Sequence, residues 1–354
     1  MSSVLIPATI LTGFLGSGKT TLLKRVLGEA HGSRIAVIEN EFGEENIDND
    51  ILVDDRQEQI VQMSNGCICC TIRDDLRATL SDLAARRRRG ELLFDRVIIE
   101  TTGVADPGPV AQTFFMDDEV ASQYLLDSIV TLVDAVHAGQ QLDTRLEAQR
   151  QVGFADRIFV SKSDLAEPAA VADLQQRLRR MNPRAPQRLV HFGEVPLQDV
   201  LDLRGFNLNA RLEIDPDFLA EQAHDHDHEH DEHCGHDHGH GHEGHAHHHH
   251  HDDDVRSFVF RSTTPFDPAR LEEFLGSIVQ IYGPRMLRYK GVLSLRGVDR
   301  KVVFQGVHQL MGSDLAAAWG AGEERESRMV FIGIDLPRDI IEQGLRQALV
   351  DNPS

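Results

Sequence analysis

The chain reads GFLGSGKT over residues 13–20, directly after an apolar run at residues 8–12 and at the start of a helix-period segment at residues 19–27. This spacing fits the pattern G-x-x-x-x-G-K-[ST] in its strand-to-helix context, where backbone N–H groups converge on phosphate oxygens. The lysine places a cation on the β- and γ-phosphates, and the threonine hydroxyl can ligate Mg²⁺. The predicted nucleotide ligands in this stretch are Gly13, Gly16, Ser17, Gly18, Lys19, Thr20 and Thr21.

Around this loop, short β-branched runs alternate with amphipathic segments, a pattern typical of βαβ units and a mostly parallel sheet. We predict an α/β domain over residues 1–205, a P-loop NTPase whose sheet is covered by helices on both faces. The predicted strands are residues 8–12, 34–38, 59–62, 95–100, 128–134, 157–160 and 187–190, and two clear helices are residues 19–27 and 73–88.

The composition changes after this domain. Residues 223–254 hold fifteen of the nineteen histidines, mixed with Asp, Glu and Gly, and have too few apolar side chains to form a core. We therefore predict a linker at 206–254 with a disordered His/Asp-rich segment, followed by a small α+β domain at 255–354. The strands predicted there are residues 257–261, 293–296, 301–305 and 328–334, and the helices are residues 268–281 and 338–349.

Charge and hydropathy exclude several classes of partner. The chain has 354 residues and a formal net charge of −21, so its surface repels phosphate backbones, which argues against nucleic-acid binding. The apolar runs have the length of strands, too short to cross a bilayer, and the N-terminus lacks a secretory signal pattern. We expect a cytoplasmic protein that binds no membrane, where clustered cysteines more often bind metal than form disulfides.

Two further stretches belong with the phosphate loop. Residues 97–103, VIIETTG, form a buried strand that delivers Glu100 to the sheet edge, where it suits a Mg²⁺-water ligand or a water-positioning residue. Residues 158–164, IFVSKSD, end in a loop in which Asp164 can accept two hydrogen bonds from guanine and the Lys162 stem can cover the base. Ser161 stands where the usual GTPase triplet has Asn, but the pattern still favours guanine.

Three cysteines, Cys67, Cys69 and Cys70, lie within four residues at a predicted strand-to-helix junction. Soft thiolates at this spacing can meet one ion, for which Zn²⁺ is the leading candidate, and they leave a fourth position open. The alternative is a trio of reduced thiols with no ligand.

The acidic loop at residues 38–48 follows the second predicted strand, where P-loop GTPases carry a switch that senses the γ-phosphate. Asp48 in this loop can face Mg²⁺ or its waters, so we group it with Lys19 and Glu100 as a catalytic candidate. The candidates to complete the thiolate site are Glu39, Glu41 and Glu44.

Taken in order, GFLGSGKTT, VIENEFGEENID, NGCICC, IIETTGVADP and SKSD resemble the CobW-type metallochaperone GTPases, close to the YjiA-like branch. Residues 287–291 and 304–307 resemble that family's C-terminal domain. The resemblance implies slow GTP hydrolysis with Mg²⁺ and delivery of a transition metal, usually zinc, with cobalt and nickel as alternatives, to a client metalloprotein. By motif it implies that Cys67, Cys69 and Cys70 ligate the metal, helped by Glu39 and Glu44, while Lys19, Thr20, Asp48 and Glu100 serve nucleotide and Mg²⁺.

The histidine-rich segment leaves a second interpretation open. Imidazoles alternating with carboxylates offer many overlapping, weakly selective sites for transition metals. The chain could therefore be a metal store in which nucleotide is structural or regulatory. A third interpretation is an ATP-dependent kinase that uses the phosphate loop at residues 13–20. The sequence also leaves a homodimer open.

Overall fold

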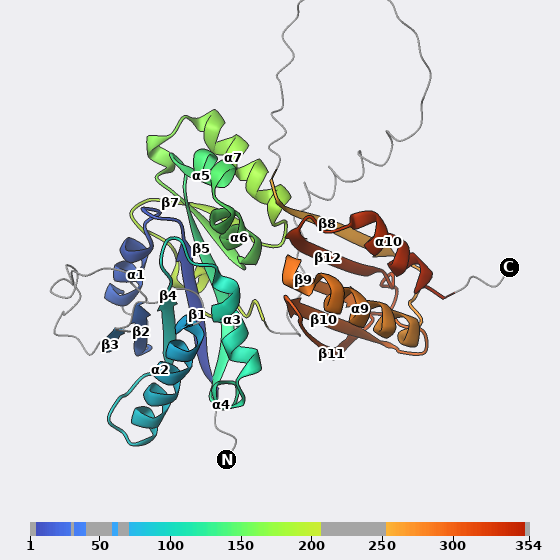
Figure 1. The fold of residues 1–354 in the computed structure, drawn as a ribbon, viewed down its shortest axis with the longest axis horizontal. Helices are drawn as coiled ribbons and strands as arrows, with labels where there is room; N and C mark the ends of the chain where they lie inside the picture. Colours follow the sequence, from blue (N-terminus) through green and yellow to red (C-terminus); the bar gives the residue numbers. More distant parts are fainter. Residues whose placement is uncertain (1–4, 30–31, 40–58, 63–70, 207–252, 351–354) are drawn as a thin grey trace, which may run out of the picture.

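The structure is a computed structural model that describes residues 5–29, 32–39, 59–62, 71–206 and 253–350 (Figure 1). Its first part is a seven-stranded, all-parallel sheet with the order β3-β2-β4-β1-β5-β6-β7. The strands are β1 (Ile6–Gly13), β2 (Ile35–Glu39), β3 (Gln59–Gln62), β4 (Arg96–Glu100), β5 (Tyr124–Asp134), β6 (Arg157–Ser161) and β7 (Gln187–Val190). The seven predicted strands are thus confirmed, with small shifts at their ends.

Helices cover both faces of this sheet, because alternate residues of a strand point to opposite sides. In β1, Ile10 belongs to the core shared with α2, α3, α6 and α7, whereas Leu11 packs with α1 on the opposite face. The helices are α1 (Lys19–Gly28), α2 (Thr71–Arg88), α3 (Pro107–Met116), α4 (Asp118–Ala121), α5 (Ala138–Thr144), α6 (Leu146–Phe154) and α7 (Pro168–Met181), with short 3₁₀ turns η1 (Ser163–Leu165) and η2 (Leu197–Asp199). The predicted doubly covered α/β fold is confirmed.

The second part is a five-stranded antiparallel sheet with the order β11-β10-β9-β12-β8. Its elements are β8 (Val255–Ser262), α9 (Pro268–Tyr282), η3 (Gly283–Arg285), β9 (Met286–Leu293), β10 (Arg300–Val307), β11 (Leu310–Ala318), β12 (Ser327–Ile334) and α10 (Arg338–Gln347). One face packs under α9 and α10, and the other contributes residues such as Val259 and Ile332 to the core of the first part. The predicted α+β class is confirmed, while the residue limits 1–205, 206–254 and 255–354 stay a prediction.

Two strands of this second sheet differ from the prediction. The strand predicted at residues 293–296 is wrong, since β9 lies earlier and ends at Leu293. Arg288 and Lys290 are buried within β9, so charged residues occupy positions that a hydrophobic pattern would need. Strand β11 was not predicted because it is an edge strand whose side chains are mostly exposed, so it shows no hydrophobic alternation.

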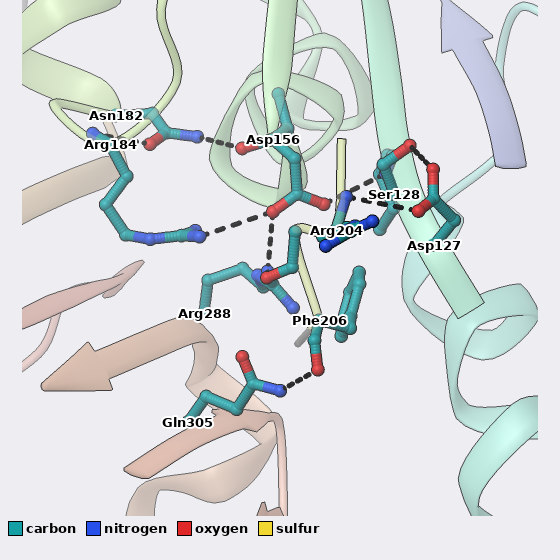
Figure 2. A network of polar contacts seen from close by, with 12 residues as sticks. Asp127, Ser128, Asp156, Asn182, Arg184, Arg204, Phe206, Arg288 and Gln305 are labelled. Carbon is teal, nitrogen blue, oxygen red and sulfur yellow. Dashed lines mark hydrogen bonds and ion pairs between the residues drawn. The ribbon is translucent and has the colours of Figure 1, made fainter. Parts of the chain in front are cut away.

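A buried polar network joins the two parts (Figure 2). In β9, Arg288 is 1% exposed, and its Nη2 donates to Oδ1 of Asp156 at 2.7 Å while its guanidinium lies 3.7 Å from the centre of the Phe206 ring. The same carboxylate oxygen accepts from Nη2 of Arg184 at 3.2 Å, and Gln305 donates to the Phe206 carbonyl. Burial, opposed by Asp156, lowers the pKa of Arg288 to about 10, so this arginine stays charged at neutral pH.

His308 lies at the contact between the two parts. Its Nδ1 is 3.2 Å from the Gly283 carbonyl, and its ring centre is 5.2 Å from that of Phe154. Burial lowers its pKa below the usual 6.5, with Asp106 favouring and Arg150 opposing the charged form. As the pH falls, the unfolded chain therefore binds this proton at a higher pH than the folded chain does, and the stability that the neutral ring contributes is lost below about pH 6.5.

We expect the His308→Gln variant to lose less thermal stability than the unaltered chain between pH 7 and pH 5; equal losses would contradict this.

Candidate nucleotide site

The phosphate loop connects the end of β1 to the start of α1. Gly13 has a φ of 146°, and a Cβ at this position would lie 2.4 Å from the Leu132 carbonyl oxygen, so the loop leaves no room for a side chain there. Gly18 caps α1 in the left-handed region with a φ of 97°. Each conformation requires glycine, and together they turn the loop at the N-terminus of α1, as a phosphate-binding loop requires.

Lys19 folds back over the loop. Its side chain is 9% exposed, and its Nζ donates to the Gly13 carbonyl at 2.8 Å and to the Phe14 carbonyl at 3.4 Å. The ammonium is therefore held against the loop backbone. The Ser17 hydroxyl in the same loop is buried and has no hydrogen-bond partner among the described residues. A cation and an unpaired hydroxyl in one glycine-rich turn suit the oxygens of a polyphosphate.

Thr20 and Glu100 come together at the sheet edge. Thr20 Oγ1 donates to Glu100 Oε1 at 3.2 Å, and Glu100 lies beside Leu11 in the register of β1 and β4. A hydroxyl and a carboxylate oxygen are hard donors of the kind that Mg²⁺ prefers, so the two residues predicted to serve the magnesium ion fit that ion. Thr21, the next predicted ligand, is on the exposed side of α1.

The segment after β4 closes against the phosphate loop. A Cβ at Gly103 would lie 2.6 Å from the backbone nitrogen of Leu15, so these two backbones are in direct contact. Gln151 from α6 donates through Nε2 to the carbonyls of Gly103 and Ala105, at 3.2 and 3.0 Å. Sequence reasoning missed Gln151 because a single polar residue in an amphipathic helix carries no distinguishing signal.

The predicted base-binding loop follows β6. Ser161 Oγ donates to the Ser17 carbonyl at 2.7 Å, which ties this loop to the phosphate loop. Lys162 has a φ of 57°, and its Nζ donates to Oδ2 of Asp134 at 2.7 Å. Burial would raise the pKa of Asp134, but hydrogen bonds from Lys162 and His137 outweigh it and lower the pKa, so the carboxylate stays charged. Asp134, which the sequence analysis did not identify, thus holds the end of the Lys162 side chain. Asp164, two residues later, has a side chain that is partly exposed.

The predicted metal site lies mostly outside the described residues. Cys67, Cys69, Cys70, Glu44 and Asp48 all fall there, and the described ranges contain no group of three His, Cys, Asp or Glu side chains that could hold an ion. Glu39 is described: it ends β2 in register with Glu100 on one side and Gln62 on the other. The chain therefore enters residues 40–58 after Glu39 and residues 63–70 after Gln62 at the end of the sheet that carries Glu100, whereas it returns from residues 40–58 to Gln59 at the opposite end.

The chain matches two family descriptions over most of its length. Residues 7–188 match the CobW/HypB/UreG nucleotide-binding domain, and residues 255–349 match the cobalamin synthesis protein cobW C-terminal domain. The chain belongs to the CobW family. This confirms the resemblance inferred from the sequence motifs, and this CobW-family chain carries no helix in its described ranges that is long and apolar enough to span a membrane.

Similar proteins include the zinc chaperone YjiA of Escherichia coli, 39% identical over 97% of this chain and 99% of that protein. The zinc chaperone CobW of Pseudomonas aeruginosa is 34% identical over 97% of this chain and 92% of that protein. A crystal structure of Zn(II)-bound YjiA GTPase from E. coli superposes with a TM-score of 0.75 at 35% identity, covering 98% of this chain and all of that one.

Proposed function

We propose that this CobW-family chain is a GTP-hydrolysing metallochaperone that binds zinc at its CxCC motif and transfers it to a client protein. The observation that carries the proposal is the adjacency of Glu39 and Glu100 in register, because it puts the start of the predicted metal-responsive loop beside the Mg²⁺ candidates. Relatives named as zinc chaperones, and one named as a zinc-regulated GTPase metalloprotein activator, support it.

In this proposal the chain is a GTPase that uses GTP with Mg²⁺ and carries Zn²⁺ as cargo. Lys19 neutralises the phosphates, Thr20 holds Mg²⁺, and Glu100 positions a water or a Mg²⁺-bound water. Asp164 and Lys162 recognise guanine. The thiolates of Cys67, Cys69 and Cys70 would bind the zinc cargo, helped by Glu39 and Glu44, and Asp48 would face Mg²⁺. The cytoplasmic location, the client protein and a homodimer also stay predictions.

Coupling between the two ligands tests the proposal. If metal and GTP share the loop at residues 39–48, zinc must change GTP affinity by the factor by which GTP changes zinc affinity. We expect a change of about fivefold or more in the Kd for GTP when Zn²⁺ is added, measured by calorimetry in both orders of addition. The Cys69→Ala/Cys70→Ala variant should lose this response.

Two further variants sharpen this experiment. Cys234→Ala removes the fourth cysteine, outside the CxCC motif, and should keep the full response. Deleting residues 224–251 separates a chaperone from a store: a chaperone keeps one tight zinc site, whereas a store loses nearly all its capacity. Identical GTP affinities with and without zinc in the unaltered chain would contradict the coupling.

A further inference from the structure

Two loops meet at the sheet edge where the base is expected to bind. Strands β6 and β7 are parallel neighbours, with Ser161 beside Val190, so the residues that follow them leave the sheet at the same edge as the phosphate loop. One side-chain contact joins these loops: Nδ1 of His191 lies 3.2 Å from Oδ1 of Asp164. The proposed guanine-binding carboxylate therefore has His191 as a direct neighbour.

His191 begins a tight turn with a fixed position. The Glu194 N–H donates to the His191 carbonyl at 2.8 Å, and both central residues have positive φ, 46° at Phe192 and 72° at Gly193. A Cβ at Gly193 would lie 3.0 Å from the Cα of Leu22, so the turn is pressed against α1, the helix that starts at the phosphate loop. The turn that carries His191 is thus positioned relative to α1 as well as to Asp164.

Stability does not account for this arrangement. The His191 and Asp164 side chains are 53% and 42% exposed, and an ion pair with that much solvent contributes little to folding. The left-handed backbone at Phe192 is strained, and the residue is 84% exposed, so packing does not compensate the strain. Strain that stability does not explain is typical of a functional loop.

We infer that His191 is a positioning residue for guanine recognition; the inference rests on the proposed function. The Nδ1 atom of His191 lies 3.2 Å from Oδ1 of Asp164, and this contact limits the rotation of the carboxylate. Guanine offers Asp164 two donors, N1–H and the exocyclic amine, and a two-point contact tolerates little rotation. Inosine triphosphate lacks the amine, makes one bond and depends less on that rotation.

The test compares the Kd values of GTP, ITP and ATP for the full chain, using competition with a fluorescent GDP analogue. The unaltered protein should bind GTP about tenfold or more tighter than ITP, because one charge-assisted hydrogen bond is lost. His191→Leu should reduce this ratio to about threefold or less, chiefly by weakening GTP, and His191→Ala should do the same. His191→Gln keeps an N–H donor and should restore part of the ratio.

A matched control lies in the same turn. Glu194→Gln alters an exposed residue paired with Arg25 at 3.6 Å and should keep the original ratio between the Kd values for ITP and GTP. An unchanged ratio in both His191→Leu and His191→Ala overturns the inference but leaves GTP hydrolysis standing. Equal binding of GTP and ATP by the unaltered chain overturns the guanine assignment itself, and the inference with it.

Discussion

Replacing Lys19 with alanine is expected to lower GTP turnover by about 100-fold or more, the size of effect that follows loss of one preorganised charge at a developing anion. The Lys19 ammonium is almost fully buried and held at 2.8 Å from the Gly13 carbonyl, so it is oriented before nucleotide arrives. Its charge is therefore preorganised beside the glycine-rich loop. The measurement is phosphate release at saturating GTP and Mg²⁺, with GTP binding followed separately.

The control for this variant is Arg25→Ala. It removes a positive charge from the same helix, at an exposed position paired with Glu29 at 2.9 Å, and should leave turnover within about twofold. Thermal unfolding of both variants shows whether each is folded. Undiminished hydrolysis by folded Lys19→Ala protein would mean that the glycine-rich loop is not the catalytic phosphate site.

The phosphate site could be predicted from the sequence because its chemistry is local. The glycines at 13 and 18 are fixed by backbone geometry, and Lys19 and Thr20 follow them directly on one helix. Glu100 could be predicted because a buried strand ends on it, and parallel strands end at one edge. Spacing along the chain was sufficient in each case.

Other features depend on contacts that spacing does not encode. The Asp134 contact that holds Lys162 and the His191 contact to Asp164 each join loops that are distant in sequence. The burial of Arg288 was not predicted for a different reason. A charged residue in a sequence usually indicates a solvent-exposed position, whereas Arg288 is buried against Asp156. Strand β9 was therefore missed because buried charges interrupt its apolar pattern, and the site contacts were missed because they join residues far apart in the sequence.

Asp156 is expected to be the most sensitive residue for stability outside the nucleotide site. Its Oδ1 accepts from Arg184 and Arg288, its Oδ2 accepts from the Ile129 N–H at 2.9 Å, and its side chain is 3% exposed. Burial, reinforced by the charges of Arg184 and Arg288, also lowers the pKa of Lys290 to about 8. Asp156→Asn would leave these buried cations without their shared carboxylate, so we expect a loss of about 3–5 kcal/mol in the free energy of unfolding, measured with urea.

The partner variants show whether charge is the cause. Asp95→Asn alters an exposed carboxylate paired at 3.0 Å with Arg34, which is also exposed, and should cost about 1 kcal/mol or less. Asp156→Asn combined with Arg288→Met should cost less than the sum of the single variants, because one buried charge is removed with its partner. Additive losses would instead assign the effect to packing.

Asp156 also precedes β6, whose far end carries the base-binding loop, so the contact between the two parts and the proposed guanine site lie at opposite ends of one strand. The GTP-to-ITP ratio of folded Asp156→Asn protein should therefore equal that of the unaltered chain.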